Sequence, residues 1–170
     1  MSNTNRSFSL IELVVVISII TILTIMAIPS YRKYEIKANI SEGMVVIDMV
    51  NRVIAEYYSA TGAFPPAATL AARLGTTYSS GYIVFNYKNV ANIMYNDPGA
   101  ATSIYYGVGF TFDVPSGSGR SYIYLVANTN NGAALTFQCG IWNISSPNSW
   151  HIIDPSYLPN SCNQTNVSAY

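Results

Sequence analysis

The sequence predicts an α+β fold: a long N-terminal helix packed on a four-stranded antiparallel sheet, followed by a C-terminal loop closed by a disulfide. The prediction rests on an uncharged run from Leu13 to Ser30, a helical repeat that continues to Thr61, and a change to strand-like segments from Gly81. A chain of 170 residues has room for one such helix and one modest domain.

The first half of the helix, residues 8–30, is predicted to cross a membrane. Its charge-free part is just long enough, because a hydrocarbon core about 30 Å thick needs roughly 20 predominantly apolar helical residues. No small-residue signal-peptidase site precedes Pro29, so we expect the segment to be retained. Pro29 cannot bond to the carbonyl of Ile25 and is therefore predicted to kink the helix.

A carboxylate, Glu12, stands at the start of this apolar run. A charged side chain in a membrane segment is costly and calls for a partner. The spacing from Ser9 to Glu12 fits a capping box, in which the carboxylate accepts a hydrogen bond from a free N–H at the helix start. The alternative is a pair with a positive group of another molecule, and the residues alone leave both open.

Residues 31–62 continue the helix with a single apolar face. The apolar positions recur at steps of three and four, at Met44, Ile47, Val50, Ile54 and Tyr57. Gly62, followed by two prolines, is predicted to end the helix. An apolar face of this length needs a partner, so we expect it to cover the sheet.

The segment 63–80 is predicted as a loop with a short helical piece over "AATLAARLG". The region 81–142 is predicted as the sheet, because four segments in it are rich in aromatic and β-branched residues. These segments are Gly81–Lys88, Ser103–Val114, Ser121–Asn128 and Ala134–Trp142. Glycine-containing turns at 115–119 and 129–132 would join the last three as hairpins.

The two cysteines, Cys139 and Cys162, lie in the last quarter of the chain. No histidine or further cysteine stands at zinc-ligand spacing, so they form either a disulfide or two unrelated buried thiols. We favour the disulfide, because the segment between them is loop-like and would need pinning. A disulfide would place this part of the chain outside the cytoplasm. We expect no metal and no cofactor.

Composition argues against several functions. The formal net charge is zero and 9% of residues are charged, which does not suit a purely electrostatic nucleic-acid binder. The single histidine, His151, is near Asp154 but lacks a nucleophile or second base at a suitable spacing, so no enzyme is expected. Trp142, Trp150 and Tyr157 could stack on bases, but we favour packing against the sheet.

The stretch "FSLIELVVVISIITILTIMAIPSYRKY" resembles the start of type IV pilins and of type II secretion pseudopilins. A short polar leader precedes a Phe, a Glu is fifth counted from that Phe, and an apolar run leads to Pro-x-Tyr. The segments "FQCGIWN" and "SYLPNSC" are similar to the cysteine-bearing edges of the pilin D-region. The cysteine pair, without a loop of clustered Asp and Glu, disfavours the major pseudopilin. The resemblance implies a pilin roll.

The resemblance also implies a processing site. Residues 1–7 would be a leader that a prepilin peptidase removes by cutting between Ser7 and Phe8. The new amino group of Phe8 would then be methylated. Glu12 would pair with that amine in a neighbouring copy and set the register between subunits, and Pro29 would mark the bend of the helix.

At the other end of the chain, the resemblance makes 139–162 a D-region bounded by the Cys139–Cys162 disulfide, and leaves 163–170 as a tail. The implied function is a structural subunit of a type IV pilus filament, supporting adhesion, twitching motility or DNA uptake. The precursor would lie in the inner membrane and the product in a cell-surface pilus. Its partners would be copies of itself, the peptidase and the assembly machinery, with a host surface or DNA as a candidate ligand.

Two alternatives remain at this stage. The chain could be a minor pilin or a DNA-uptake receptor of the same machinery. It could also be a single-pass membrane protein that never polymerises, if Ser7, which stands where the family has Gly, blocks processing.

Overall fold

The structure is a computed structural model that describes residues 9–96, 98, 103–111, 121–129, 134–141, 151–162 and 164–165. Contacts divide the chain into two units, Met1–Ile36 and Lys37–Tyr170. Helix α1 (Leu10–Thr61) begins in the first unit and ends in the second. The predicted end of the helix is confirmed, because Gly62 follows with φ 71° and donates its N–H to the carbonyl of Tyr58.

The first unit presents an uncovered apolar helix. Every large apolar side chain from Leu10 to Ile28 is exposed, including Leu10 at 79% and Ile25 at 67%. By length and composition α1 could cross a membrane, and its most apolar window has a mean hydropathy of 2.8. Pro29 lies within the helical range of α1, and the predicted kink stays a prediction.

Three hydroxyl groups of this half are satisfied within the helix itself. Ser18 donates to the carbonyl of Val14, Thr21 to that of Ile17, and Thr24 to that of Ile20, each at 2.7 Å. With these bonds the three hydroxyls need no water as a partner. This is the condition that a helix in hydrocarbon has to meet.

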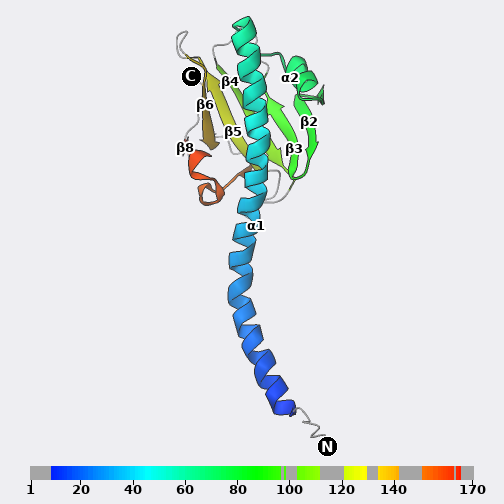
Figure 1. The fold of residues 1–170 in the computed structure, drawn as a ribbon, viewed down its shortest axis with the longest axis vertical. Coiled ribbons are helices and arrows are strands. Elements are labelled where there is room, and N and C mark those ends of the chain that lie inside the picture. The colour runs from blue at the N-terminus through cyan, green and yellow to red at the C-terminus, as the bar shows by residue number, and fades with distance from the viewer. Residues whose placement is uncertain are drawn as a thin grey trace, which may run out of the picture. The chain divides into compact units, whose positions relative to one another are not determined.

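The second unit packs the later part of α1 against a sheet, as Figure 1 shows with the cyan turns crossing the strands. Most of the predicted stripe is confirmed: Ile47, Val50 and Ile54 are buried, whereas Met44 and Tyr57 are only half-buried. Ile40 and Val46 are also buried in this contact face.

Close approach of helix and sheet depends on Gly43. A Cβ at this position would overlap the ring of Phe110 on the sheet. Gly in a helix interior costs about 1 kcal/mol relative to Ala, so the sequence alone marks this residue as a weakness. The structure shows that it makes room for an aromatic ring that is fully buried.

The sheet is larger than predicted. The strands are β1 (Thr77–Ser79), β2 (Tyr82–Tyr87), β3 (Val90–Tyr95), β4 (Ser103–Phe110), β5 (Ser121–Asn128), β6 (Thr136–Ile141), β7 (His151–Ile152) and β8 (Gln164–Thr165). Strands β1 to β6 form an antiparallel meander in chain order. The two-residue strands β7 and β8 pair in parallel with β5 and β6.

The prediction of four strands was therefore wrong, although all four predicted segments contain a strand. The missing β3 follows β2 through a turn at Lys88, which has a positive φ of 47°. Hairpin turns of this kind usually carry Gly or Asn at such a position, so Lys88 gave no turn signal. The connections predicted at 115–119 and 129–132 lie outside the described residues, apart from Thr129.

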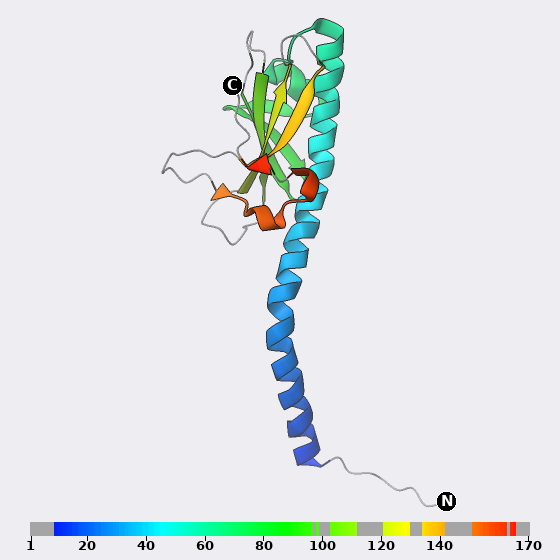
Figure 2. The same ribbon diagram turned by 90° about the vertical axis from the view of Figure 1, so that its left-hand side faces the viewer.

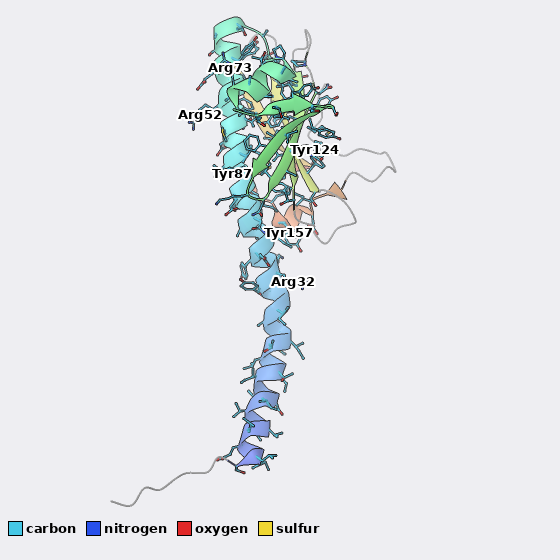
Figure 3. All side chains as sticks on the ribbon, turned by 90° about the vertical axis from the view of Figure 1, so that its right-hand side faces the viewer. Arg32, Arg52, Arg73, Tyr87, Tyr124 and Tyr157 are labelled. Atoms are coloured by element: carbon cyan, nitrogen blue, oxygen red, sulfur yellow. A yellow bond between two sulfur atoms is a disulfide. The ribbon has the colours of Figure 1, made fainter. Side chains whose placement is uncertain are left out.

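The two faces of the sheet differ. Phe110 and Tyr106 on β4 meet α1, since the Phe110 ring lies against Gly43 and the Tyr106 hydroxyl donates to Asn51 Oδ1. On the opposite face, Tyr122 and Tyr124 of β5 lie over glycines of β4. Figure 3 shows Tyr124 on the side away from α1.

The segment that follows α1 contains more regular secondary structure than predicted. Helix α2 (Ala67–Arg73) matches the expected helical piece, but β1 corrects the loop prediction that extended to residue 80. The Arg73 guanidinium lies 5.2 Å from the centre of the Tyr57 ring, which ties α2 to α1. After β6 come two short 3₁₀ turns, η2 (Pro155–Tyr157) and η3 (Asn160–Cys162).

Candidate functional site

The first candidate site is the start of α1. The N–H of Ser9 donates to Glu12 Oε2 at 3.0 Å. The capping interaction that the spacing predicted is therefore present within a single chain. A carboxylate has two oxygens and about four lone-pair sites, so this bond leaves acceptor capacity for a further donor. Ser7 and Phe8 lie outside the described residues, and their predicted roles stay predictions.

Glu12 stands at the edge of the uncovered apolar surface. Leu13 beside it is 54% exposed and Ile11 is 69% exposed. Continuous apolar surface of this extent is rare on a soluble monomer and marks a surface that contacts lipid or protein. A carboxylate at its border can give such a contact a defined register, because burying the charge without a partner is costly.

The second candidate site is the C-terminal region, where the disulfide is confirmed. Cys139 on β6 is bonded to Cys162 on η3, and their Cα atoms are 4.6 Å apart. The alternative of two unrelated thiols is thus wrong. Closing a loop of this length stabilises by roughly 3 kcal/mol in the chain-entropy model. The bond holds η3 beside β6, and β8 then pairs with β6 at Gly140.

The aromatic candidates of this region are only partly tested. Trp142 and Trp150 lie outside the described residues. His151 belongs to β7, but its side chain is likewise outside the described set. Tyr157 is half-buried in η2 (Figure 3), and Asp154 accepts the Ser156 N–H at 2.8 Å, as in an Asx turn. Asp154 therefore has a structural role in the turn.

Two buried tyrosines have raised pKa values. Burial raises the pKa of Tyr106 well above its usual value, and Tyr95 and Asp48 add to the effect. Burial raises the pKa of Tyr124 to about 12, with further contributions from Tyr122 and Tyr82. A tyrosine is protonated at neutral pH even without such a shift, so the raised pKa values matter only at high pH.

Sequence reasoning missed a polar contact between α1 and the β2–β3 turn. Lys88 Nζ lies 3.1 Å from Glu42 Oε1, and Asn89 donates to Glu42 Oε2 and to Asn39 Oδ1. Lys88 and Asn89 are adjacent, and Glu42 follows Asn39 by three positions on the helix. Since the turn itself was not predicted, no signal linked these pairs.

Comparison with known proteins adds independent evidence. Residues 2–28 match the model of the prokaryotic N-terminal methylation motif. The chain is 28% identical to the fimbrial protein EcpC of Eikenella corrodens over 162 residues, which is 95% of this chain and 93% of that protein.

Two Neisseria proteins align over part of their length. A fimbrial protein of Neisseria meningitidis is 33% identical over 84 residues, and the type IV major pilin protein PilE of Neisseria gonorrhoeae is 32% identical over 88 residues. The alignments cover 49% and 53% of these proteins, and 49% and 52% of this chain. The family resemblance inferred from the N-terminal motif is confirmed.

Proposed function

This chain belongs to the type IV pilin family, and we propose on that premise that its copies polymerise into a pilus through the apolar half of α1. One observation carries the proposal. All the large apolar side chains from Leu10 to Ile28 are uncovered in the single chain. Other copies are the partner that would cover this surface outside a membrane, and relatives named as fimbrial proteins support that partner.

Before assembly, the same helix would hold the precursor in the inner membrane. Its length, its hydropathy and its internally bonded hydroxyls all suit a lipid environment. The disulfide suits a domain exposed to an oxidising compartment. The proposed path therefore leads from the inner membrane to a filament on the cell surface, by way of the pilus assembly machinery.

Processing by a prepilin peptidase would prepare the chain for assembly. The match to the methylation motif supports a cut between Ser7 and Phe8 and methylation of the Phe8 amine. Glu12 would then accept that amine from a neighbouring copy while it keeps the bond from its own Ser9 N–H. Such an ion pair specifies register even where it adds little net stability.

The outward parts of the subunit would serve adhesion, twitching motility or DNA uptake. The domain that carries them has a structural role in this proposal and performs no catalysis. A host surface or DNA is the candidate ligand, and the half-buried Tyr157 belongs to the region that would contact it.

The test is the composition of surface filaments. Filaments sheared from cells that express the chain should contain it as their main repeating subunit. Trace amounts in filaments built from another subunit would replace the proposal with a minor pilin or an uptake receptor. Retention of all the protein in the membrane fraction, with no filaments, would contradict assembly altogether.

A further inference from the structure

A groove in the second unit lies where α1 meets the disulfide-linked end of the chain. It has a volume of about 450 Å³, and its walls come from α1, β5, β6 and the segment that leads into Cys162. Figure 2 shows these elements side by side, with the amber β6 and the red 3₁₀ turn next to the helix. This volume is within the range of roughly 300–1,000 Å³ that is typical of pockets for small ligands.

The chemistry of the groove is specific. Its apolar walls include Met44, Ile47, Leu125 and Phe137, and the carboxylate of Asp48 is at its border. Asp48 is exposed, and among the described residues no ion pair within 4.0 Å involves it. A long aliphatic stem that ends in a cation fits apolar walls beside one carboxylate, which is the build of a Lys or Arg side chain.

We propose that this groove receives the basic pair Arg32–Lys33 of a second copy of the chain. Both side chains are exposed on α1 directly after the apolar half. Among the described cations of the second unit, Lys88 is paired with Glu42 and Arg73 lies over Tyr57. Lys37 and Arg52 are exposed as well, but both belong to the unit that carries the groove itself and do not directly follow the apolar half of α1. Arg32 and Lys33 take part in no ion pair among the described residues.

The position of this pair along α1 supports the choice. The inference rests on the proposed function, in which copies pack through the apolar half of α1. The basic pair continues that contact surface, so packing of parallel copies brings it beside a later turn of the neighbouring helix. Copies that are offset along the helix would bring the basic pair of one copy beside Asp48 of the next.

The test is a charge reversal between the two positions. Asp48→Lys alone, and Arg32→Glu with Lys33→Glu, should each lower the yield of sheared filaments by about tenfold, since each places like charges in contact. The combination of all three changes should restore most of the yield, as in a double-mutant cycle. Within one chain the two positions are more than four turns apart on α1, so the restored contact is between copies.

Two controls keep the result specific. Glu56→Lys makes the same charge change at an exposed position of α1 outside the groove, and should leave the yield unchanged. The membrane fraction of every variant should contain protein with an intact disulfide and the protease resistance of the wild type. This measurement shows that a low yield comes from assembly and not from failure to fold.

The outcomes separate the inference from the proposed function. If the wild type forms filaments and Asp48→Lys gives a normal filament yield, the inference is overturned while the proposed function stands. A loss in the single-site variants that the combined variant does not repair would also overturn it, because the groove would then face another group. Absence of filaments in the wild type would contradict the proposed function, and the inference with it.

Discussion

Variants of Glu12 test whether its carboxylate only caps the helix or also pairs with the amine of a neighbouring copy. Glu12→Gln keeps an oxygen that can accept the Ser9 N–H but removes the charge. We expect this variant to fold, to reach the membrane and to enter filaments poorly, because the amine of the neighbouring copy loses its counter-charge. The yield of sheared filaments, relative to the amount in the membrane fraction, measures the effect.

Glu12→Ala removes both roles and serves as the reference for that experiment. If the charge matters, the Gln and Ala variants should behave alike. Normal piliation of Glu12→Gln, with a loss only in Glu12→Ala, would reduce Glu12 to a helix cap.

Gly43 decides how closely α1 approaches the sheet. Ala is the better helix former by about 1 kcal/mol, yet Gly43→Ala would push a methyl group into the Phe110 ring. Overpacking in a core typically costs 1–3 kcal/mol, so we expect a lower unfolding temperature of the full chain in detergent. Ser41→Ala, an exposed change on the same helix, is the matched control and should have little effect. A rise in unfolding temperature for Gly43→Ala would contradict the packing at this position.

The raised pKa values of Tyr124 and Tyr106 predict that the protein loses stability at high pH. Their pKa values are raised in the folded state, to about 12 for Tyr124, so between pH 10 and 12 the native protein holds protons that the unfolded chain has lost. The free energy of unfolding therefore falls as pH rises through this range and is unaffected by these groups below it.

Denaturant unfolding between pH 8 and pH 12 measures this effect. Tyr124→Phe, which cannot ionise, should lose less stability over the range than the wild type. Equal slopes for the two proteins would show that Tyr124 does not contribute.

At the scale of elements, the hydrophobic pattern predicted the helix and the strands with a periodic apolar face. It missed the strand that follows an atypical turn. The stripe on α1 and the aromatic alternation of β2, β4 and β5 were readable, because burial of one face sets a period. Strand β3 was not readable, since it contains the buried Asn92 and follows a turn at Lys88 instead of a glycine. Asn92 is satisfied by the Tyr122 hydroxyl at 3.1 Å, a contact that only the pairing of strands creates.

The candidate sites were likewise predictable only in part. A local motif placed the Glu12 cap, because the spacing from Ser9 to Glu12 decides it. The Cys139–Cys162 pair was predicted for another reason: the chain has two cysteines, and the segment between them is loop-like. The groove at Asp48 was not predictable, because its walls come from α1, two strands and η3, which are distant in sequence. Its shape depends on register and on the disulfide.

The disulfide is the element that fixes the C-terminal region. Cys139→Ser should release η3 from β6 and make the segment after β6 sensitive to protease, with a loss of roughly 3 kcal/mol of stability. The variant that replaces both cysteines by Ser removes the free thiol and should behave alike. Wild-type resistance in both variants would mean that β8 and the buried Ile153 and Leu158 hold this region without the bond.

For the whole molecule, the central claim is that an apolar helix first anchors the chain and then joins it to other copies. Two facts support the claim from different directions: the exposed apolar surface of α1, and the match of residues 2–28 to the methylation motif. The second of these functions would depend on the new N-terminus, because the Phe8 amine is free only after the leader is removed.

The intact mass of the protein from sheared filaments and from the membrane fraction therefore tests the account most directly. We predict that the filament protein has the mass of a chain that begins at Phe8 and carries one methyl group. That mass would show that Ser7 is accepted at the cleavage site and that the amine is free to meet Glu12. A mass that still includes Met1–Ser7, found only in membranes, would contradict assembly and leave a single-pass membrane protein.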